Sequence, residues 1–224
     1  RLSSFGSLRH FRRENQPAGA ADRCLDCPFA AGCVYSAVTY YRQHLAAGNH
    51  GWPLDVITDD FTETGVTRAL REGPYGRCVY ACDNDVVDHQ TVNFLFDRDV
   101  SGTFTMTAFS EEGRGRETEF FGTHGSIRGD TAKIEVHRFH GETSVYDMTE
   151  TNGMLDGGHL GGDAGLIHDF TGALLAGDPG LLSSSPQVSL ASHLMAFAAE
   201  ESRLHGGQVM DIKLHGCGNE SDLP

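Results

Sequence analysis

The sequence has 224 residues, of which 39% are hydrophobic, and this is enough apolar material for a folded core rather than a disordered chain. Its formal net charge of −14 at pH 7 argues against nucleic acid or an anionic membrane as a partner. No apolar run reaches the roughly 18 residues that a membrane-spanning helix needs, so we expect a cytoplasmic protein.

The first 50 residues are predicted to form a cysteine-containing N-terminal extension, with residues 1–34 irregular. Cys24 and Cys27 are separated by two residues, and Cys33 follows shortly after. Two thiolates at this spacing can hold one ion, so Cys24, Cys27 and Cys33 are candidate ligands of zinc. Zinc needs a fourth ligand, and only folding could supply one, from His10, His44, Cys78 or Cys82. A disulfide and free thiols are the alternatives.

Helical spacing of apolar residues predicts helices over residues 34–47 and 62–71. Asp60 or Thr62 is suited to cap the second helix. Between the two helices, Val56-Ile57 is predicted to be a short extended piece.

A run of strands follows. Residues 86–96 and 100–109 are predicted to pair across a turn at residues 97–99. In the second of these strands, apolar and threonine side chains alternate, which predicts an apolar face and a threonine face. Further strands are predicted at residues 117–121, 126–128 and 132–139, and a Gly-Thr-His-Gly turn joins the first two of them.

The last third of the chain is predicted to be helical. A glycine-rich loop containing His159 leads into a helix over residues 165–176, with Asp163 as its cap. Ser184 or Ser185 with Pro186 opens a second helix over residues 187–205. Residues 208–213 are predicted to add an edge strand.

Two groups of polar residues are candidate ligand-binding sites. The first is Cys82-Asp83-Asn84-Asp85, followed by Asp88-His89, where short polar side chains gather before a strand and could meet hydroxyl groups. The second is His159 with Asp163, because the glycines around His159 allow a ligand to approach the backbone closely. A satisfied turn and a flexible surface loop are the alternative interpretations.

Several segments resemble the second domain of the Gfo/Idh/MocA oxidoreductases. They are PYGRCVY at 74–80, CDNDVVDHQ at 82–90, FGTHGSI at 121–127, the glycine-rich loop at 157–163, and SHLMAFAAE at 192–200. The resemblance covers nearly the whole chain. It implies an α+β fold in which helices cover one face of a large, open and mostly antiparallel sheet, so that residues 1–224 form a single C-terminal substrate-binding and oligomerisation domain.

The resemblance also implies an activity for the full-length protein. Members of this family transfer hydride between a sugar, cyclitol or related polyol and NAD or NADP, which is bound by an N-terminal Rossmann domain. This sequence does not contain that domain. It also lacks the catalytic Glu-Lys-Pro motif, since neither Lys133 nor Lys213 precedes a proline. The substrate-side candidates are Asn84, Asp85, His159 and Asp163, and no residue is assigned a catalytic role.

Two alternatives to a dehydrogenase remain open. One is a glycoside hydrolase of the same fold that oxidises its sugar transiently with tightly held NAD. The other is a non-catalytic scaffold that serves only for assembly. In each case we expect a homodimer formed through the uncharged threonine face, because a solvated sheet face normally carries Lys or Glu.

Overall fold

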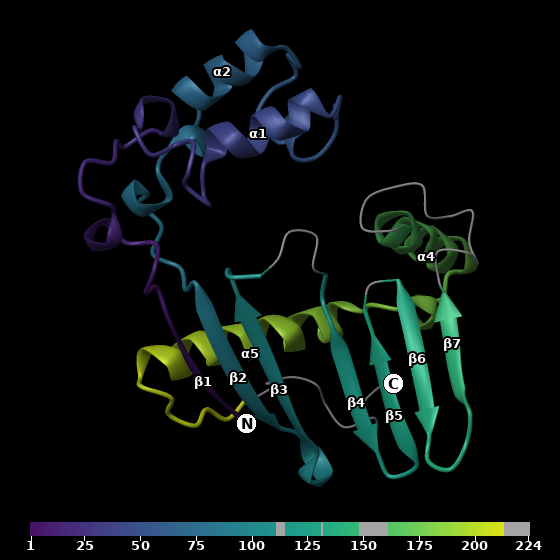
Figure 1. Cartoon of the computed structure of the whole chain (residues 1–224). Coiled ribbons are helices and arrows are strands. Elements are labelled where there is room, and N and C mark those ends of the chain that lie inside the picture. The colour runs from purple at the N-terminus through teal and green to yellow at the C-terminus, as the bar shows by residue number, and fades with distance from the viewer. Residues whose placement is uncertain (111–114, 131, 148–160, 213–224) are drawn as a thin grey trace. The chain divides into compact units, whose positions relative to one another are not determined.

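The computed structural model describes residues 1–110, 115–130, 132–147 and 161–212 (Figure 1). It is an α+β protein in which contacts divide the chain into two compact units. Unit 1 comprises Arg1–Ala108 with Ser202–Val209, and unit 2 comprises Phe109–Glu201 with Met210–Pro224. A single functional domain over the whole chain stays a prediction. In the described part of the chain, no helix is long and apolar enough to cross a membrane.

The strands pair into two antiparallel sheets, of three and four strands, whereas the sequence led us to expect one large sheet. The three-stranded sheet belongs to unit 1 and has the order β1 (Leu2–Ser7), β2 (His89–Leu95) and β3 (Ser101–Thr107). The four-stranded sheet belongs to unit 2.

Strand β1 corrects the prediction that residues 1–34 are irregular. It pairs along its whole length with β2, with Leu2 opposite Phe94 and Ser4 opposite Val92. Leu2, Ser4 and Val92 are all nearly inaccessible to solvent. This pairing is between segments almost ninety residues apart, and it makes the N-terminal segment an edge strand of the unit 1 sheet.

The predicted hairpin of β2 and β3 is confirmed. Asp97–Asp99 forms its turn, in which Arg98 and Asp99 both adopt a φ of 60°. Phe104 lies opposite Val92, and Thr105 lies opposite Thr91, so the two rows of side chains fall on opposite faces as predicted. On the apolar face Val92 is buried but Phe104 is 54% exposed, and the threonine row of β3 (Thr103, Thr105 and Thr107) is exposed as well.

Helices α1 (Ala37–Ala46) and α2 (Glu63–Glu72) confirm the two predicted helices of unit 1. Thr62 caps α2, because its Oγ1 accepts the backbone N–H of Gly65 at 3.1 Å. A hydrophobic core joins the two helices and is made of Tyr41, Leu54, Val66 and Leu70. Leu54 reaches this core from a 3₁₀ turn, Leu54–Val56, so the prediction of an extended piece at Val56-Ile57 is wrong.

A buried serine near the end of α5 (Pro186–Leu204) completes unit 1. The Oγ of Ser202 accepts the backbone N–H of Ser4 at 2.9 Å and donates to the carbonyl of Gln208 at 2.6 Å. Ser4 also accepts a hydrogen bond through its Oγ, from the side chain of Gln90 in β2 at 2.9 Å. Ser202 and Ser4 are fully buried, so this polar chain fixes β1 between β2 and the end of α5.

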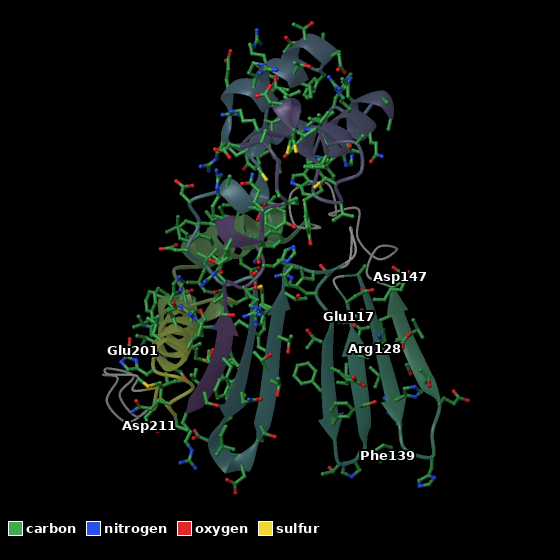
Figure 2. The ribbon with its side chains drawn as sticks, turned by 60° about the vertical axis from the view of Figure 1, so that its left-hand side comes forward. Glu117, Arg128, Phe139, Asp147, Glu201 and Asp211 are labelled. Carbon is green, nitrogen blue, oxygen red and sulfur yellow. The ribbon has the colours of Figure 1, made fainter. Side chains whose placement is uncertain are left out.

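The sheet of unit 2 has the order β4 (Thr118–Gly122), β5 (Gly125–Gly129), β6 (Lys133–Arg138) and β7 (Thr143–Asp147). The first three strands were predicted, and β7 was not. The Gly-Thr-His-Gly turn joins β4 to β5, and Gly125 is required there because a Cβ would collide with the backbone of His137. Figure 2 shows Glu117 and Arg128 of this unit, whose charged groups lie 3.7 Å apart.

Helices α4 (Gly162–Ala176) and α5 confirm the two predicted C-terminal helices. The backbone N–H of Val188 donates to Ser185 Oγ at 3.3 Å, which confirms Ser185 at the start of α5. The prediction that Asp163 caps α4 is wrong: the cap is Gly161, with a φ of 84°, and Asp163 lies in the first turn. Met210 forms only an isolated β-bridge, so no edge strand is present in the described residues of 208–213.

Candidate functional site: a cysteine-lined cavity and a polar segment

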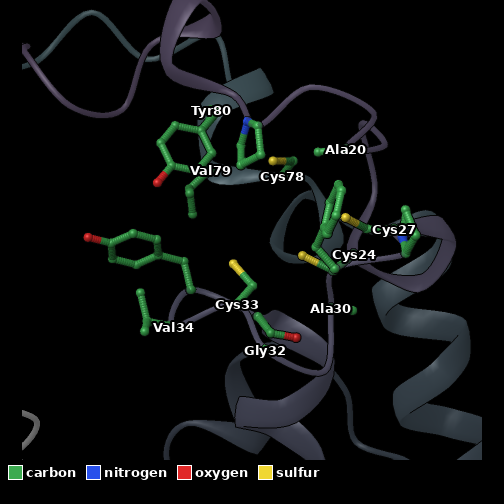
Figure 3. Close-up of a pocket in the computed structure, with 15 residues that line it drawn as sticks. Ala20, Cys24, Cys27, Ala30, Gly32, Cys33, Val34, Cys78, Val79 and Tyr80 are labelled. Atoms are coloured by element: carbon green, nitrogen blue, oxygen red, sulfur yellow. The ribbon is translucent and has the colours of Figure 1, made fainter.

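Four cysteines of unit 1 line one cavity of about 570 Å³. They are Cys24, Cys27, Cys33 and Cys78, and Figure 3 shows their side chains around a common space. Three of them come from the N-terminal extension, and Cys78 comes from the segment that precedes β2. Folding therefore brings a fourth thiol to the three that the sequence grouped.

Backbone pairing places Cys78 beside the N-terminal cysteines. Arg23 and Arg77 form an antiparallel bridge, and the N–H of Cys78 donates to the carbonyl of Asp22 at 2.8 Å. The guanidinium of Arg23 in turn donates to the carbonyl of Leu70 at 2.9 Å, at the end of α2. Because each bridged arginine directly precedes a cysteine, the bridge fixes Cys24 relative to Cys78 and anchors both to the helical core.

The thiol of Cys24 is the most enclosed of this group, with 8% of the residue exposed. Burial raises the pKa of Cys24, and the backbone N–H of Ala37, the first residue of α1, acts in the opposite direction. Negative charge on Cys78, Cys33 or Cys27 raises this pKa further. The sulfur atoms of Cys27, Cys33 and Cys78 therefore all lie within electrostatic reach of Cys24.

Aromatic side chains form another wall of the cavity. Tyr35 and Tyr80 both line it, and their ring centres lie 6.1 Å apart. The hydroxyl of Tyr80 and Nε2 of His10 are 3.0 Å apart, so a hydrogen bond holds the Tyr80 ring in place. The cavity is thus bounded by thiols and by large rings with fixed positions.

Metal binding, a disulfide and free thiols were the three states expected for the cysteines. The five described cysteines are free, so the disulfide alternative is not formed among them. No group of three or more His, Cys, Asp or Glu side chains in the described ranges is arranged to hold a metal ion. Zinc at Cys24, Cys27 and Cys33 therefore stays a prediction. Of the four candidates for a further ligand, Cys78 lines the cavity, and Cys82 instead donates to the carbonyl of Cys78 at 3.3 Å.

The predicted substrate residues Asn84 and Asp85 lie on an exposed segment that leads from this cavity to β2. At its start, Asp83 accepts a hydrogen bond from the guanidinium of Arg77 at 2.8 Å. At its end is Asp88, whose side chain is only 1% exposed. The segment is therefore held at both ends, and the two polar side chains between them face solvent.

Asp88 is the anchor of this segment and was not recognised as one from the sequence. Its Oδ2 accepts the backbone N–H groups of Arg9 at 2.9 Å and His10 at 2.6 Å, and its Oδ1 lies 2.7 Å from Nδ1 of His89. Burial alone would raise the pKa of Asp88, but hydrogen bonds from His10, His89, Arg9 and Phe11 outweigh it and lower the pKa to about 2. A carboxylate that remains ionised thus ties the segment to the residues that follow β1.

Of the remaining predicted substrate residues, only Asp163 is described, and it belongs to a different compact unit from Asn84 and Asp85. His159 lies outside the described residues. Asp163 belongs to unit 2, in the first turn of α4, where a negative charge is favourable near the helix N-terminus.

Comparisons with known proteins give no relative for this chain. No family model matches it, and no curated protein or solved structure matches it either.

Proposed function

We propose that this chain is the substrate-binding and oligomerisation part of a cytoplasmic NAD(P)-dependent oxidoreductase of the Gfo/Idh/MocA kind. Its substrate would be a sugar, a cyclitol or a related polyol, and NAD or NADP would be bound by a Rossmann domain that this sequence does not contain. The motif resemblance at residues 74–90, 121–127 and 192–200 supports this proposal, as does the α+β class of the fold.

One observation carries the proposal: Asn84 and Asp85 are exposed on a segment that is fixed at both ends. The Arg77–Asp83 pair holds one end, and the buried Asp88 holds the other. A polar group that is held in place before the ligand arrives loses little conformational entropy on binding. The segment is therefore preorganised for recognition of hydroxyl groups.

The chemistry of the two side chains suits a polyol. The carboxylate of Asp85 accepts hydrogen bonds from hydroxyl groups, and the carboxamide of Asn84 both donates and accepts. Together they can engage neighbouring hydroxyls that each donate and accept one bond. In the full-length enzyme, hydride would pass from the carbinol carbon to the nicotinamide while a base takes the hydroxyl proton. We assign that base to no residue of this chain.

Ligand-observed NMR on the 224-residue chain tests this proposal with a panel of inositols, hexoses and hexitols. We expect saturation transfer to at least one polyol, with a large loss in Asp85→Ala. Asp97→Ala is the matched control, because it removes an exposed carboxylate from the β2–β3 turn.

The same measurement is made with NAD and NADP. We expect no binding, because the chain lacks a phosphate-binding glycine loop of the dinucleotide type. Micromolar affinity for either nucleotide would contradict the proposal that a separate Rossmann domain binds the cofactor. Polyol signals that are equal in wild type and Asp85→Ala would contradict the proposed site.

A further inference from the structure

We propose that Cys24, Cys27, Cys33 and Cys78 bind an iron–sulfur cluster in the cavity of unit 1. This inference does not depend on the oxidoreductase proposal, because it rests only on the cavity and the thiols around it. It differs from the zinc prediction in two ways: it adds Cys78 as the fourth ligand, and it replaces one ion with a cluster.

The number of thiols and their distribution along the chain fit this ligand. Iron–sulfur clusters are held by four cysteine thiolates, commonly three from a short stretch and one from a distant part of the chain. Here Cys24, Cys27 and Cys33 come from a short stretch, and Cys78 is brought to them by the bridge between Arg23 and Arg77. Cys27 is followed directly by a proline, which turns the chain away after the ligand.

The arrangement of the thiols favours a cluster over a single ion. A tetrahedral zinc site with Zn–S distances of about 2.3 Å places its four sulfur atoms about 3.8 Å from one another. All four cysteines instead line one cavity of about 570 Å³, which is far larger than the space at the centre of such a zinc site. In a cluster the thiolates bind different iron atoms, so they surround a body that is much larger than one ion. The cavity between the four sulfurs has room for such a body.

The walls of the cavity also contribute apolar side chains: Pro17, Pro28, Phe29, Val34 and Val79. Phe29 and Val34 are 46% and 88% exposed, so the cavity is open to solvent on their side, and solvent access is one of the factors that tune a cluster. The backbone N–H of Ala37 is directed at the Cys24 thiol from the first turn of α1. A hydrogen bond and the positive end of a helix both stabilise a thiolate and the negative charge of a cluster.

The bound cluster would act as a cross-link within unit 1. Three ligands belong to the N-terminal extension, and the fourth, Cys78, shortly precedes the segment that carries Asn84 and ends at Asp88. Without the cluster, the bridge at Arg23 and Arg77 and the adjacent backbone bond of Cys78 join these two regions. Four metal–thiolate bonds would add to that junction, so loading should protect it against unfolding and proteolysis.

Metal and sulfide analysis of the wild-type chain is the primary test. The protein is purified without oxygen, and a second sample is reconstituted with ferrous iron and inorganic sulfide. We expect two or four iron atoms per chain with an equal amount of acid-labile sulfide, and a broad visible absorption that dithionite bleaches. One zinc per chain without sulfide would overturn the proposal, and so would a folded chain that takes up neither metal after reconstitution.

Two cysteine variants then test the ligands. Cys78→Ser should lose most of the bound iron and sulfide, whereas Cys82→Ser should retain both. Cys82 is a matched control because it lies four residues further on and does not line the cavity. Circular dichroism shows whether each variant is folded. Equal iron content in the two variants would overturn the assignment of Cys78, and the wild-type analysis remains decisive if Cys78→Ser fails to fold.

Discussion

The replacement Asp88→Asn removes one negative charge from the most enclosed carboxylate described in unit 1. The wild-type oxygens accept two backbone N–H groups, from Arg9 and His10, and lie beside the ring nitrogen of His89. The amide keeps the shape of the side chain, but it replaces one accepting oxygen with an N–H₂ group that faces donors. We expect unit 1 to lose stability and the contact between Asp88 and the residues after β1 to weaken.

The size of the effect follows from the pKa of Asp88. It falls from an ordinary value of 3.8 to about 2, and the side chain is 1% exposed. Each unit of such a shift corresponds to about 1.36 kcal/mol, so the ionised form stabilises the fold by up to about 2.5 kcal/mol at neutral pH. Because the folded pKa is the lower one, this stability is present above the unfolded pKa of 3.8 and is lost as the pH falls towards 2.

Urea unfolding of wild type and variant at several pH values measures this contribution, with amide hydrogen exchange of β1 as a local probe. We expect a difference in unfolding free energy of about 2 kcal/mol at pH 7 that narrows steadily below about pH 5. Asp83→Asn is the control, because its carboxylate is 86% exposed and pairs with Arg77 at the surface. That variant should leave the unfolding free energy nearly unchanged, because exposed ion pairs contribute little to stability. If the difference in unfolding free energy between wild type and Asp88→Asn is independent of pH, the electrostatic reasoning is refuted.

Two further predictions concern packing and assembly. Gly65→Ala should destabilise unit 1 by about 1–3 kcal/mol, because a Cβ there would overlap the backbone carbonyl of Asp60. In Gly172→Ala, in α4, the added Cβ meets nothing, so this variant should raise the melting temperature. Thermal unfolding in which both variants shift the melting temperature in the same direction would contradict this. Thr105→Arg should dissociate the expected homodimer, because it places charge on a sheet face whose residues in β1, β2 and β3 include no Asp, Glu, Lys or Arg. Light scattering checks this, and a wild-type mass of 24.2 kDa at high micromolar concentration would mean that the threonine face is simply solvated.

Elements stabilised by neighbouring residues were predictable from the sequence. The β2–β3 hairpin has a short turn and strict alternation, so its register follows from local pattern alone. Thr62 and Ser185 were recognised as helix caps from the sequence, because each hydroxyl oxygen accepts a backbone N–H only three residues further on. Such a signal is local. At α4 the same reasoning chose Asp163, but a left-handed Gly161 begins the helix instead.

Strand β1 could not be predicted because its stability comes from a distant partner. Residues 2–7 contain three serines and a glycine, which are poor strand formers, and only Leu2 and Phe5 are apolar. Pairing with β2 and the buried bond between Ser4 and Ser202 overcome this weak propensity. Both partners lie far along the chain, so no window of local sequence contains the signal.

The sequence predicted the local parts of the candidate site but not the parts that folding brings together. The spacing of Cys24, Cys27 and Cys33 indicated a shared site, but four residues were equally eligible as a fourth member, and only the fold shows that Cys78 lines the same cavity. The polar run before β2 was also noted, although its most exposed members and its buried anchor look alike in the sequence. Only burial and the donors from Arg9 and His10 separate Asp88 from Asp85.

The bond between Ser4 and Ser202 has a consequence for synthesis on the ribosome. These residues are 198 positions apart, and Ser202 also needs the carbonyl of Gln208. At a translation rate of about 5–20 residues per second, roughly 10–40 s pass between the synthesis of β1 and that of its last partner. During that interval the backbone N–H of Ser4 lacks its final partner, and the outer edge of β1 is open to pairing with another chain. Nascent-chain crowding and chaperone capture should therefore affect the yield of this protein more than the stability of its finished fold would suggest.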